Sequence, residues 1–239
     1  MGQFSAPISA RSGLHVKDDF IIHEGVLTNT IGDLRWAMTT IGNASTASYP
    51  VAAAVDAYGI LKDTTAATAD GDGEVYTLGV ADEIVLGAAG GRFSFKARLA
   101  DQIASNNFRI GLVDVATAGE PTIGIYAESD GGVLSLSTMS AGHGDNTAAA
   151  ARVGSLTSGT TMVLNTWTYI DVLWFGENAQ GGPANAQMWV DGYLAAEVPC
   201  NIDDDERMEF SIIHWQDSGG ALAVELDLDF IELFIGREQ

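Results

Sequence analysis

The segment from Trp167 to Val198 constrains the fold of this chain more than any other. It begins with an aromatic and β-branched run, residues 167–175, of the kind that forms a mostly buried strand. A Gly-, Pro- and Asn-rich loop separates this run from a second apolar run, and the dipeptide Asp191-Gly192 separates the second from a third. Asp-Gly between apolar runs favours a type I′ hairpin, because both central residues of that turn need positive φ. The segment therefore predicts strand, loop, strand, tight turn and strand.

Apolar and polar residues alternate with a period of two in several other segments. In residues 93–99, the apolar set that alternation directs to a core comprises Phe93, Phe95, Ala97 and Leu99. Ser94, Lys96 and Arg98 fall on the opposite face. This period is typical of a half-buried antiparallel strand. Short strands separated by turn signals, without sustained helical periodicity, indicate an all-β sandwich or barrel.

The last apolar run, residues 221–235, changes character near Asp229. Before this residue one face of the predicted strand is apolar and the other is acidic. Beyond it, apolar residues continue on the face that was acidic. A β-bulge, or a change in what covers the face, would produce this pattern.

Residues 1–18 are polar and mixed, and they predict an extended N-terminal arm ahead of one domain, residues 19–239. An arm is either a disordered terminus or a segment that docks on a neighbouring subunit. Residues 139–160 predict a long exposed loop, in which the alanine run 148–151 would add one helical turn. The N-terminus lacks a basic region followed by an apolar core, and no apolar run reaches the length of a membrane span. We therefore predict neither a signal peptide nor membrane association.

The charge balance bears on the partners of the chain. Asp and Glu total 32 and Lys and Arg total 11, which gives a formal net charge of −21. Such a surface repels phosphate backbones, so we predict no nucleic-acid binding. Solubility is the plain interpretation of this charge, and calcium binding or docking on a basic partner is the alternative. The single cysteine, Cys200, excludes an intrachain disulfide and is typical of a small buried hydrophobic residue.

Two pieces of the chain carry a family resemblance. Trp167 to Val172 and Met188 to Tyr193 resemble the concanavalin A-like lectin/glucanase superfamily, most closely its laminin-G and pentraxin branch, in which a Trp-led strand pairs with a strand ending in Val-Asp-Gly. Residues 228–233 are similar to the last strand of that fold. The resemblance implies an antiparallel two-sheet jelly-roll sandwich. Domains of this kind occur as sugar-binding modules, as glycosidases and in tailed-phage virion proteins.

Three carboxylates in line, Glu225, Asp227 and Asp229, raise the question of catalysis. Sugar hydrolysis needs two carboxyl groups spaced for acid and nucleophile roles. The laminarinase-like hydrolases of this superfamily carry Glu-x-Asp-x-x-Glu on one strand, whereas Phe230 occupies the position of the second Glu here. We therefore predict no catalytic residue and no enzymatic activity, with a glycoside hydrolase as the least favoured alternative.

Metal and ligand candidates are few. The acidic segments 70–74 and 203–206 offer the hard oxygen ligands that calcium prefers, but neither has EF-hand spacing. We predict no cofactor and no metal site, with calcium as the one alternative. His143 is a loop residue that could bind a ligand, whereas His214, beside Trp215, is more typical of a satisfied, partly buried ring.

Sugar binding on a sheet needs an aromatic side chain outside the core. Trp174 shares the phase of Ile170 and Val172, which indicates the core. Trp189 is out of phase with its two apolar neighbours and is the candidate for exposure. For Trp36, Trp167 and Trp215 we predict packing in the core or on a sheet.

The favoured functional prediction is a non-enzymatic bacteriophage virion structural protein, specifically a capsid decoration (cement) protein on the capsid surface. It rests on analogy with phage proteins: small-residue loops, an acidic surface and an arm ahead of one sandwich. The arm would grip the shell or a sister subunit near Phe4, Pro7 and Ile8. The expected partners are the major capsid protein and further copies in a trimer, since closed symmetry is the norm. The alternative is a carbohydrate-binding adhesion module on a tail, fibre or capsid surface, with a host glycan as its partner.

Overall fold

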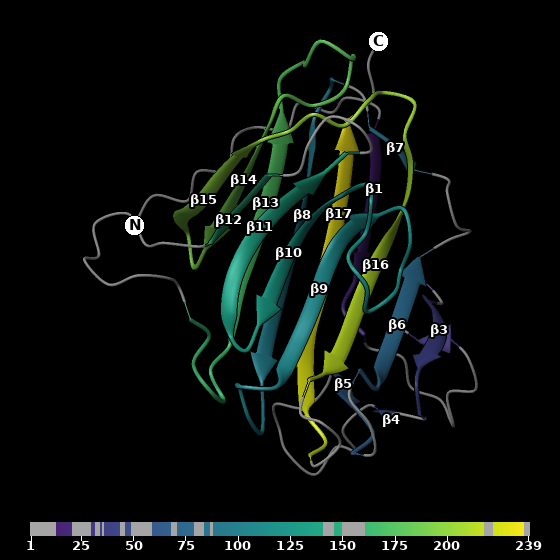
Figure 1. The fold of residues 1–239 in the computed structure, drawn as a ribbon, viewed down its shortest axis with the longest axis vertical. Helices are drawn as coiled ribbons and strands as arrows, with labels where there is room; N and C mark the ends of the chain where they lie inside the picture. Colours follow the sequence, from purple (N-terminus) through teal and green to yellow (C-terminus); the bar gives the residue numbers. More distant parts are fainter. Residues whose placement is uncertain are drawn as a thin grey trace.

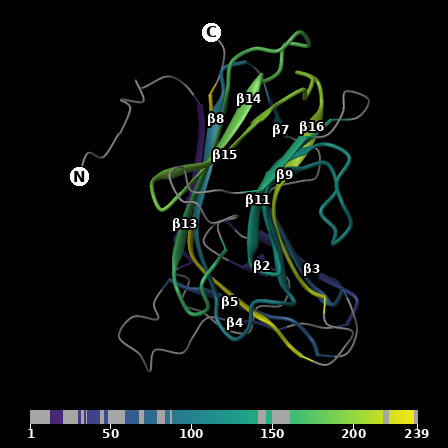
Figure 2. The ribbon, with the colours of Figure 1, turned by 60° about the vertical axis from the view of Figure 1, so that its left-hand side comes forward.

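The computed structural model describes residues 13–20, 30–31, 34, 36–43, 46–48, 59–67, 71–78, 84–86, 88–140, 146–149, 161–217 and 222–236. These residues form strands and no helix, and the strands build two antiparallel sheets that face each other as a jelly-roll-like β-sandwich (Figures 1 and 2). The predicted all-β, two-sheet fold is confirmed. Within these ranges, no helix has the length and apolar character that crossing a membrane requires.

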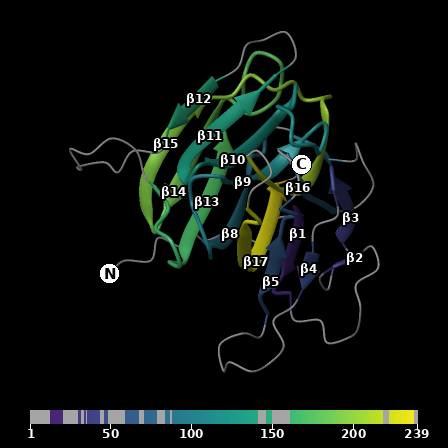
Figure 3. The same ribbon diagram turned by 60° about the horizontal axis from the view of Figure 1, so that its bottom comes forward.

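Sheet A has eight strands. In spatial order they are β15 (Tyr193–Pro199), β14 (Asn185–Val190), β13 (Thr168–Phe175), β8 (Gly91–Leu99), β17 (Glu225–Gly236), β5 (Leu61–Thr64) and β4 (Thr46–Ser48). The eighth strand, β1 (Gly13–Asp18), pairs with β17 beyond the end of β5 (Figure 3). The strands that the Trp167–Val198 segment predicts are therefore β13, β14 and β15, side by side at one edge of this sheet.

Sheet B has nine strands. In spatial order they are β12 (Asn146–Ala149), β11 (Val133–Met139), β10 (Gly124–Asp130), β9 (Asn106–Val113), β16 (Arg207–Gln216), β6 (Gly73–Leu78), β3 (Trp36–Ile41) and β2 (Thr30–Ile31). The short strand β7 (Ile84–Val85) pairs with the start of β16.

The core lies between the two sheets and is built from the inward faces predicted by alternation. Phe93, Phe95, Ala97 and Leu99 of β8 are fully buried, as the sequence predicts. The Phe93 ring lies 5.7 Å from the ring of Phe210 on sheet B, and Phe95 meets Phe108 edge-on at 6.0 Å. Burial of each such ring contributes about 1.5–3 kcal/mol, so these contacts hold the sheets together.

The hairpin between β14 and β15 has the predicted turn. Asp191 has φ 50° and Gly192 has φ 80°, the positive values that a type I′ turn requires. The turn is also tied to β13: Asp191 N donates to Tyr169 O at 2.9 Å, and Tyr169 N donates to Asp191 Oδ1 at 3.0 Å. The tip of the hairpin is thus fixed against the neighbouring strand.

Of the two explanations for the change of character near Asp229, the structure shows the bulge. The pairing of β17 with β8 shifts register between Leu228 and Phe230, so Asp229 is the extra residue. Leu226 and Leu228 face the core before the bulge, and Ile231, Leu233 and Ile235 face it afterwards. The shift leaves Phe230 on the outer face of sheet A, beside Lys96.

Two segments differ from the sequence prediction. Gly13–Asp18, the last part of the predicted arm, pairs with β17 and belongs to sheet A, because residues 231–236 leave a strand edge to which it adds. Asn146–Ala149 forms β12 on the edge of β11, so Ala148 and Ala149 are in a strand rather than a helical turn. Phe4, Pro7 and Ile8 lie outside the described residues.

A buried polar link joins the sheets at one end of the sandwich. His214 of β16 is fully buried, and its Nδ1 lies 2.7 Å from Asp63 Oδ2 on β5 of the opposite sheet. Its Nε2 lies 3.1 Å from Asn106 Oδ1, and Asn106 Nδ2 donates to Glu225 O at 2.9 Å. The ring is satisfied, as predicted, but it is buried completely rather than partly.

We expect His214→Leu to lower the free energy of unfolding by about 3–5 kcal/mol, because it leaves the buried Asp63 carboxylate without its partner. The double variant Asp63→Leu/His214→Leu should lose less than the sum of the two single variants, since it removes both polar groups. Urea denaturation of the wild type and the three variants measures this coupling. Strictly additive losses would contradict it.

Candidate functional site

The outer face of sheet A carries the site. Residues directly opposite each other on antiparallel neighbours point to the same side of a sheet, so the register defines rows across this face. One row runs from Trp189 on β14 through Asp171, Ser94 and Glu232 to Lys17 on β1. The adjacent row contains Tyr169, Lys96 and Phe230.

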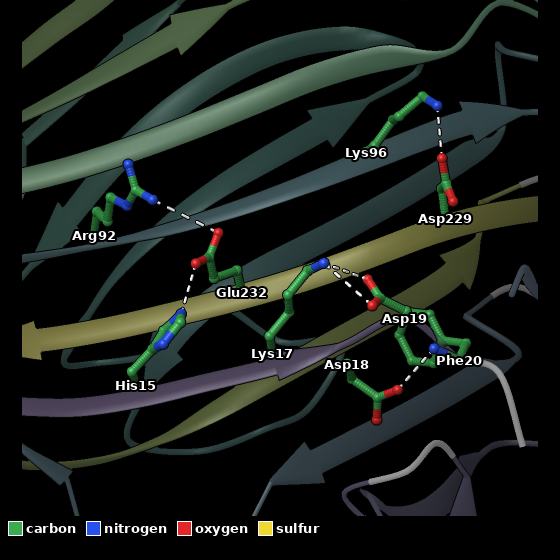
Figure 4. A network of polar contacts seen from close by, with 9 residues as sticks. All are labelled: His15, Lys17, Asp18, Asp19, Phe20, Arg92, Lys96, Asp229 and Glu232. Carbon is green, nitrogen blue, oxygen red and sulfur yellow. Dashed lines mark hydrogen bonds and ion pairs between the residues drawn. The ribbon is translucent and has the colours of Figure 1, made fainter. Parts of the chain in front are cut away.

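An ion-pair ladder occupies the β17 side of the face. We use this name for the outward carboxylates Glu225, Asp227, Asp229 and Glu232 with their basic partners. The pairs are Lys62–Glu225, Arg98–Asp227, Lys96–Asp229 at 2.6 Å, Arg92–Glu232 at 3.6 Å and His15–Glu232 at 2.6 Å. Figure 4 shows the part of the ladder from His15 to Asp229, together with the neighbouring pair Lys17–Asp19.

The ladder explains the acidic row seen in the sequence. Each of Glu225, Asp227 and Asp229 holds a Lys or Arg from a neighbouring strand, and the Asp227 side chain is only 3% exposed. A catalytic carboxyl must be free to meet the substrate. These carboxylates instead connect β17 to β8 and β5, and Phe230 stands beside them with no acid function.

Four aromatic side chains lie on this face, and we call them the aromatic row: Trp167, Tyr169, Trp189 and Phe230. All four are partly exposed. Lys96 Nζ lies 5.1 Å and Arg98 Cζ 4.8 Å from the centre of the Trp167 ring, in cation–π contact. The rings of Tyr169 and Phe230 lie 5.9 Å apart, although β8 separates their strands.

Asp171 lies between Trp189 and Ser94, on the same face as the aromatic row. The Ser94 hydroxyl donates to Asp171 Oδ1 at 2.7 Å. Desolvation raises the pKa of the Asp171 carboxyl, and the Ser94 hydrogen bond and the charge of Arg92 oppose that rise. Among the described residues, Asp171 Oδ2 and the indole Nε1 of Trp189 have no hydrogen-bond partner. The row thus presents one acceptor and one donor beside an aromatic surface.

On the outer face of sheet B, the side chains of Arg109 and Tyr126 are buried, whereas the aromatic side chains on the outer face of sheet A are partly exposed. Arg109 of β9 is 4% exposed, and its guanidinium lies 4.8 Å from the Tyr126 ring and 5.3 Å from the Trp215 ring. It also pairs with Glu128 at 3.1 Å and donates to Gly119 O, which belongs to the β9–β10 loop that covers this part of the face. Desolvation raises the pKa of Tyr126 to about 12. These residues form a second packed cluster rather than an accessible surface.

The remaining sequence candidates have structural roles or lie outside the described residues. Trp174 is in the core, and Trp189 faces outward, as predicted. Asp72 accepts from Asn43 N at 2.8 Å, and no group of three or more His, Cys, Asp or Glu in the described ranges is arranged to hold a metal. Cys200 is buried, which raises the pKa of its thiol to about 11. His143 and Asp70 are not among the described residues.

The sequence analysis missed Asp171, Tyr169 and Phe230 as members of one surface. The alternation of residues 168–175 carries the signal for the first two, because they are out of phase with Ile170 and Val172. Placing Phe230 beside them requires the bulge at Asp229 and the pairing order of three strands. Only the structure supplies both.

The comparisons with known proteins identify the fold. No family model matches the chain, and no curated protein matches it. Among solved structures, the chain is similar to a protein of unknown function, SO2946 from Shewanella oneidensis MR-1, at 12% identity and a TM-score of 0.59, over 96% of this chain and 91% of that one. At this low identity, the structural similarity shows a shared β-sandwich fold and nothing further.

The chain is also similar to structures of botulinum neurotoxins. One is a type C structure described as showing that cell entry depends on interaction with two ganglioside molecules, at 9% identity and a TM-score of 0.54 over 94% of this chain. Another is the binding domain of neurotoxin DC in complex with SialylT, at 9% identity and a TM-score of 0.51 over 87% of this chain. The chain spans only 49% and 44% of the length of these two structures. Here too the similarity shows the fold.

The raised pKa of Asp171 predicts a pH dependence. The folded state disfavours the charged carboxylate, so the penalty is present above the folded-state pKa and disappears as the pH falls through it. We expect Asp171→Asn to unfold at a higher temperature than the wild type at pH 7, and this difference to shrink towards acidic pH. Asp205→Asn removes an exposed charge in a turn and controls for net charge. Equal, pH-independent shifts in the two variants would contradict the prediction.

Proposed function

We propose that the protein is a carbohydrate-binding module and that the aromatic row on sheet A is its binding surface. The observation that carries the proposal is the co-location of four partly exposed aromatic side chains with an acceptor and a donor, Asp171 Oδ2 and Trp189 Nε1, that have no partner in the described part of the chain. A sugar ring has an apolar C–H face that stacks on an aromatic ring and hydroxyls that need hydrogen-bonding partners. Aromatic rings beside a few oriented polar groups meet both requirements.

Two further observations support this class of function. The carboxylates of the ion-pair ladder are held by cations, which suits a surface that binds without cleaving. The neurotoxin structures that share the fold have descriptions that name a ganglioside interaction and a complex with SialylT. Those ligands belong to the neurotoxins, and the jelly-roll architecture in general includes lectin domains. The choice of surface on this chain rests on the aromatic row itself.

We expect Trp189→Ala to weaken glycan binding by about tenfold or more, because it removes the ring and the donor Nε1 together. Tyr193→Ala is the matched control: this ring is 62% exposed, but its cross-strand partner Val190 faces the core, so it is not part of the aromatic row. A glycan array followed by calorimetric titration measures both variants. Equal losses in the two variants, or no glycan bound by the wild type, would contradict the proposal.

The virion role predicted from the sequence stays a prediction. We propose it as the second candidate, with the major capsid protein and sister subunits as partners, on the strength of the phage-like composition and the N-terminal segment described above. The two functions are compatible, since an adhesion module can be displayed on a capsid surface. Sedimentation of the purified chain tests the expected trimer: a sedimenting species of three copies supports it, and a strict monomer at all concentrations counts against it.

A further inference from the structure

The aromatic row contains a preorganised hydrogen-bonding pair. Asp171 and Trp189 are direct cross-strand partners, so their Cβ atoms lie about 4.5–5.5 Å apart on the same face. Ser94, which is fully buried, fixes Asp171 by its hydrogen bond to Oδ1. The carboxylate is therefore held in one orientation, with Oδ2 as the oxygen that remains for a ligand.

This pair matches sugar hydroxyls in a defined way. A ligand hydroxyl donates its proton to Asp171 Oδ2, and a hydroxyl oxygen accepts from the indole Nε1–H of Trp189. The adjacent aromatic surface receives the C–H face of the same sugar ring. Because Asp171 is already oriented by Ser94, little conformational freedom is lost when a ligand binds.

The charges on the face decide which sugars fit. The described Lys and Arg side chains of this face are engaged by carboxylates: Lys17 by Asp19, Lys62 by Glu225, Arg92 by Glu232, Lys96 by Asp229 and Arg98 by Asp227. A carboxylate on the ligand would lie beside Asp171 and near Glu232, and Arg92, the cation whose charge reaches Asp171, already has Glu232 at 3.6 Å. The chain as a whole carries a formal net charge of −21, which adds long-range repulsion.

We propose that the aromatic row selects neutral saccharides through Asp171 and Trp189 and excludes sialylated and uronic-acid-containing glycans. This inference rests on the carbohydrate-binding function proposed above and adds the class of ligand. It separates the chain from the neurotoxin structures that share its fold, whose descriptions name gangliosides and SialylT. The selectivity originates in the pairing of the surface charges, a property of these residues and not of the fold.

A glycan array printed as matched pairs tests the inference, with each neutral core present with and without a terminal sialic acid. We expect the wild type to bind neutral members at least tenfold more tightly than their sialylated counterparts. Raising the salt concentration should narrow this gap, because screening weakens the repulsion. Asp171→Asn should weaken neutral binding and also narrow the gap, since it removes the nearest charge while an amide oxygen can still accept from Ser94.

The possible failures are distinguishable. Preferential binding of sialylated glycans, or a gap that neither salt nor Asp171→Asn changes, overturns the inference and leaves the carbohydrate-binding function intact. Binding to no member of the array overturns the proposed function and the inference with it. Asp205→Asn, which removes a charge outside this face, should leave the selectivity unchanged, and thermal unfolding verifies that every variant is folded.

Discussion

The change of phase in β17 at Asp229 determines what each side of sheet A presents. Up to Leu228 the strand sends one set of alternating residues to the core, and one extra residue transfers that role to the set beginning at Ile231. Without the bulge, the second half of the strand would withdraw three apolar side chains from the core, and Phe230 would face the core in their place. The bulge therefore maintains the packing against sheet B and supplies an aromatic ring to the outer surface.

The ion-pair ladder follows from the central position of β17. Its outward acids face β8 on one side and β5 and β1 on the other, and each of those strands supplies basic side chains at matching positions. Exposed pairs of this kind each contribute little to stability, typically below about 1 kcal/mol. Their larger effect is on the specificity of strand pairing, because opposite charges at paired positions favour this strand order and oppose a slipped register.

The sequence predicted the parts of the fold that local pattern controls. Alternation placed the β8 core residues correctly, Asp191-Gly192 defined a hairpin, and the switch in polarity near Asp229 indicated the bulge. The sequence did not predict strands whose pairing partners are distant in the chain. Gly13–Asp18 carries too little apolar pattern to predict a strand, and it is one because β17 offers an unpaired edge. The aromatic row could not be predicted for the same reason, since Trp189, Tyr169 and Phe230 come together only through the order of four strands.

The attachment of the hairpin tip to β13 restricts how this surface can change during evolution. Asp191 fixes the backbone of Tyr169 through two hydrogen bonds, so the position of Tyr169 in the aromatic row depends on the conformation of the turn. Insertions accumulate most easily in exposed turns, and here an insertion would also displace a residue of the aromatic row. Diversification of this surface is therefore expected to proceed by substitution of outward side chains at constant hairpin length.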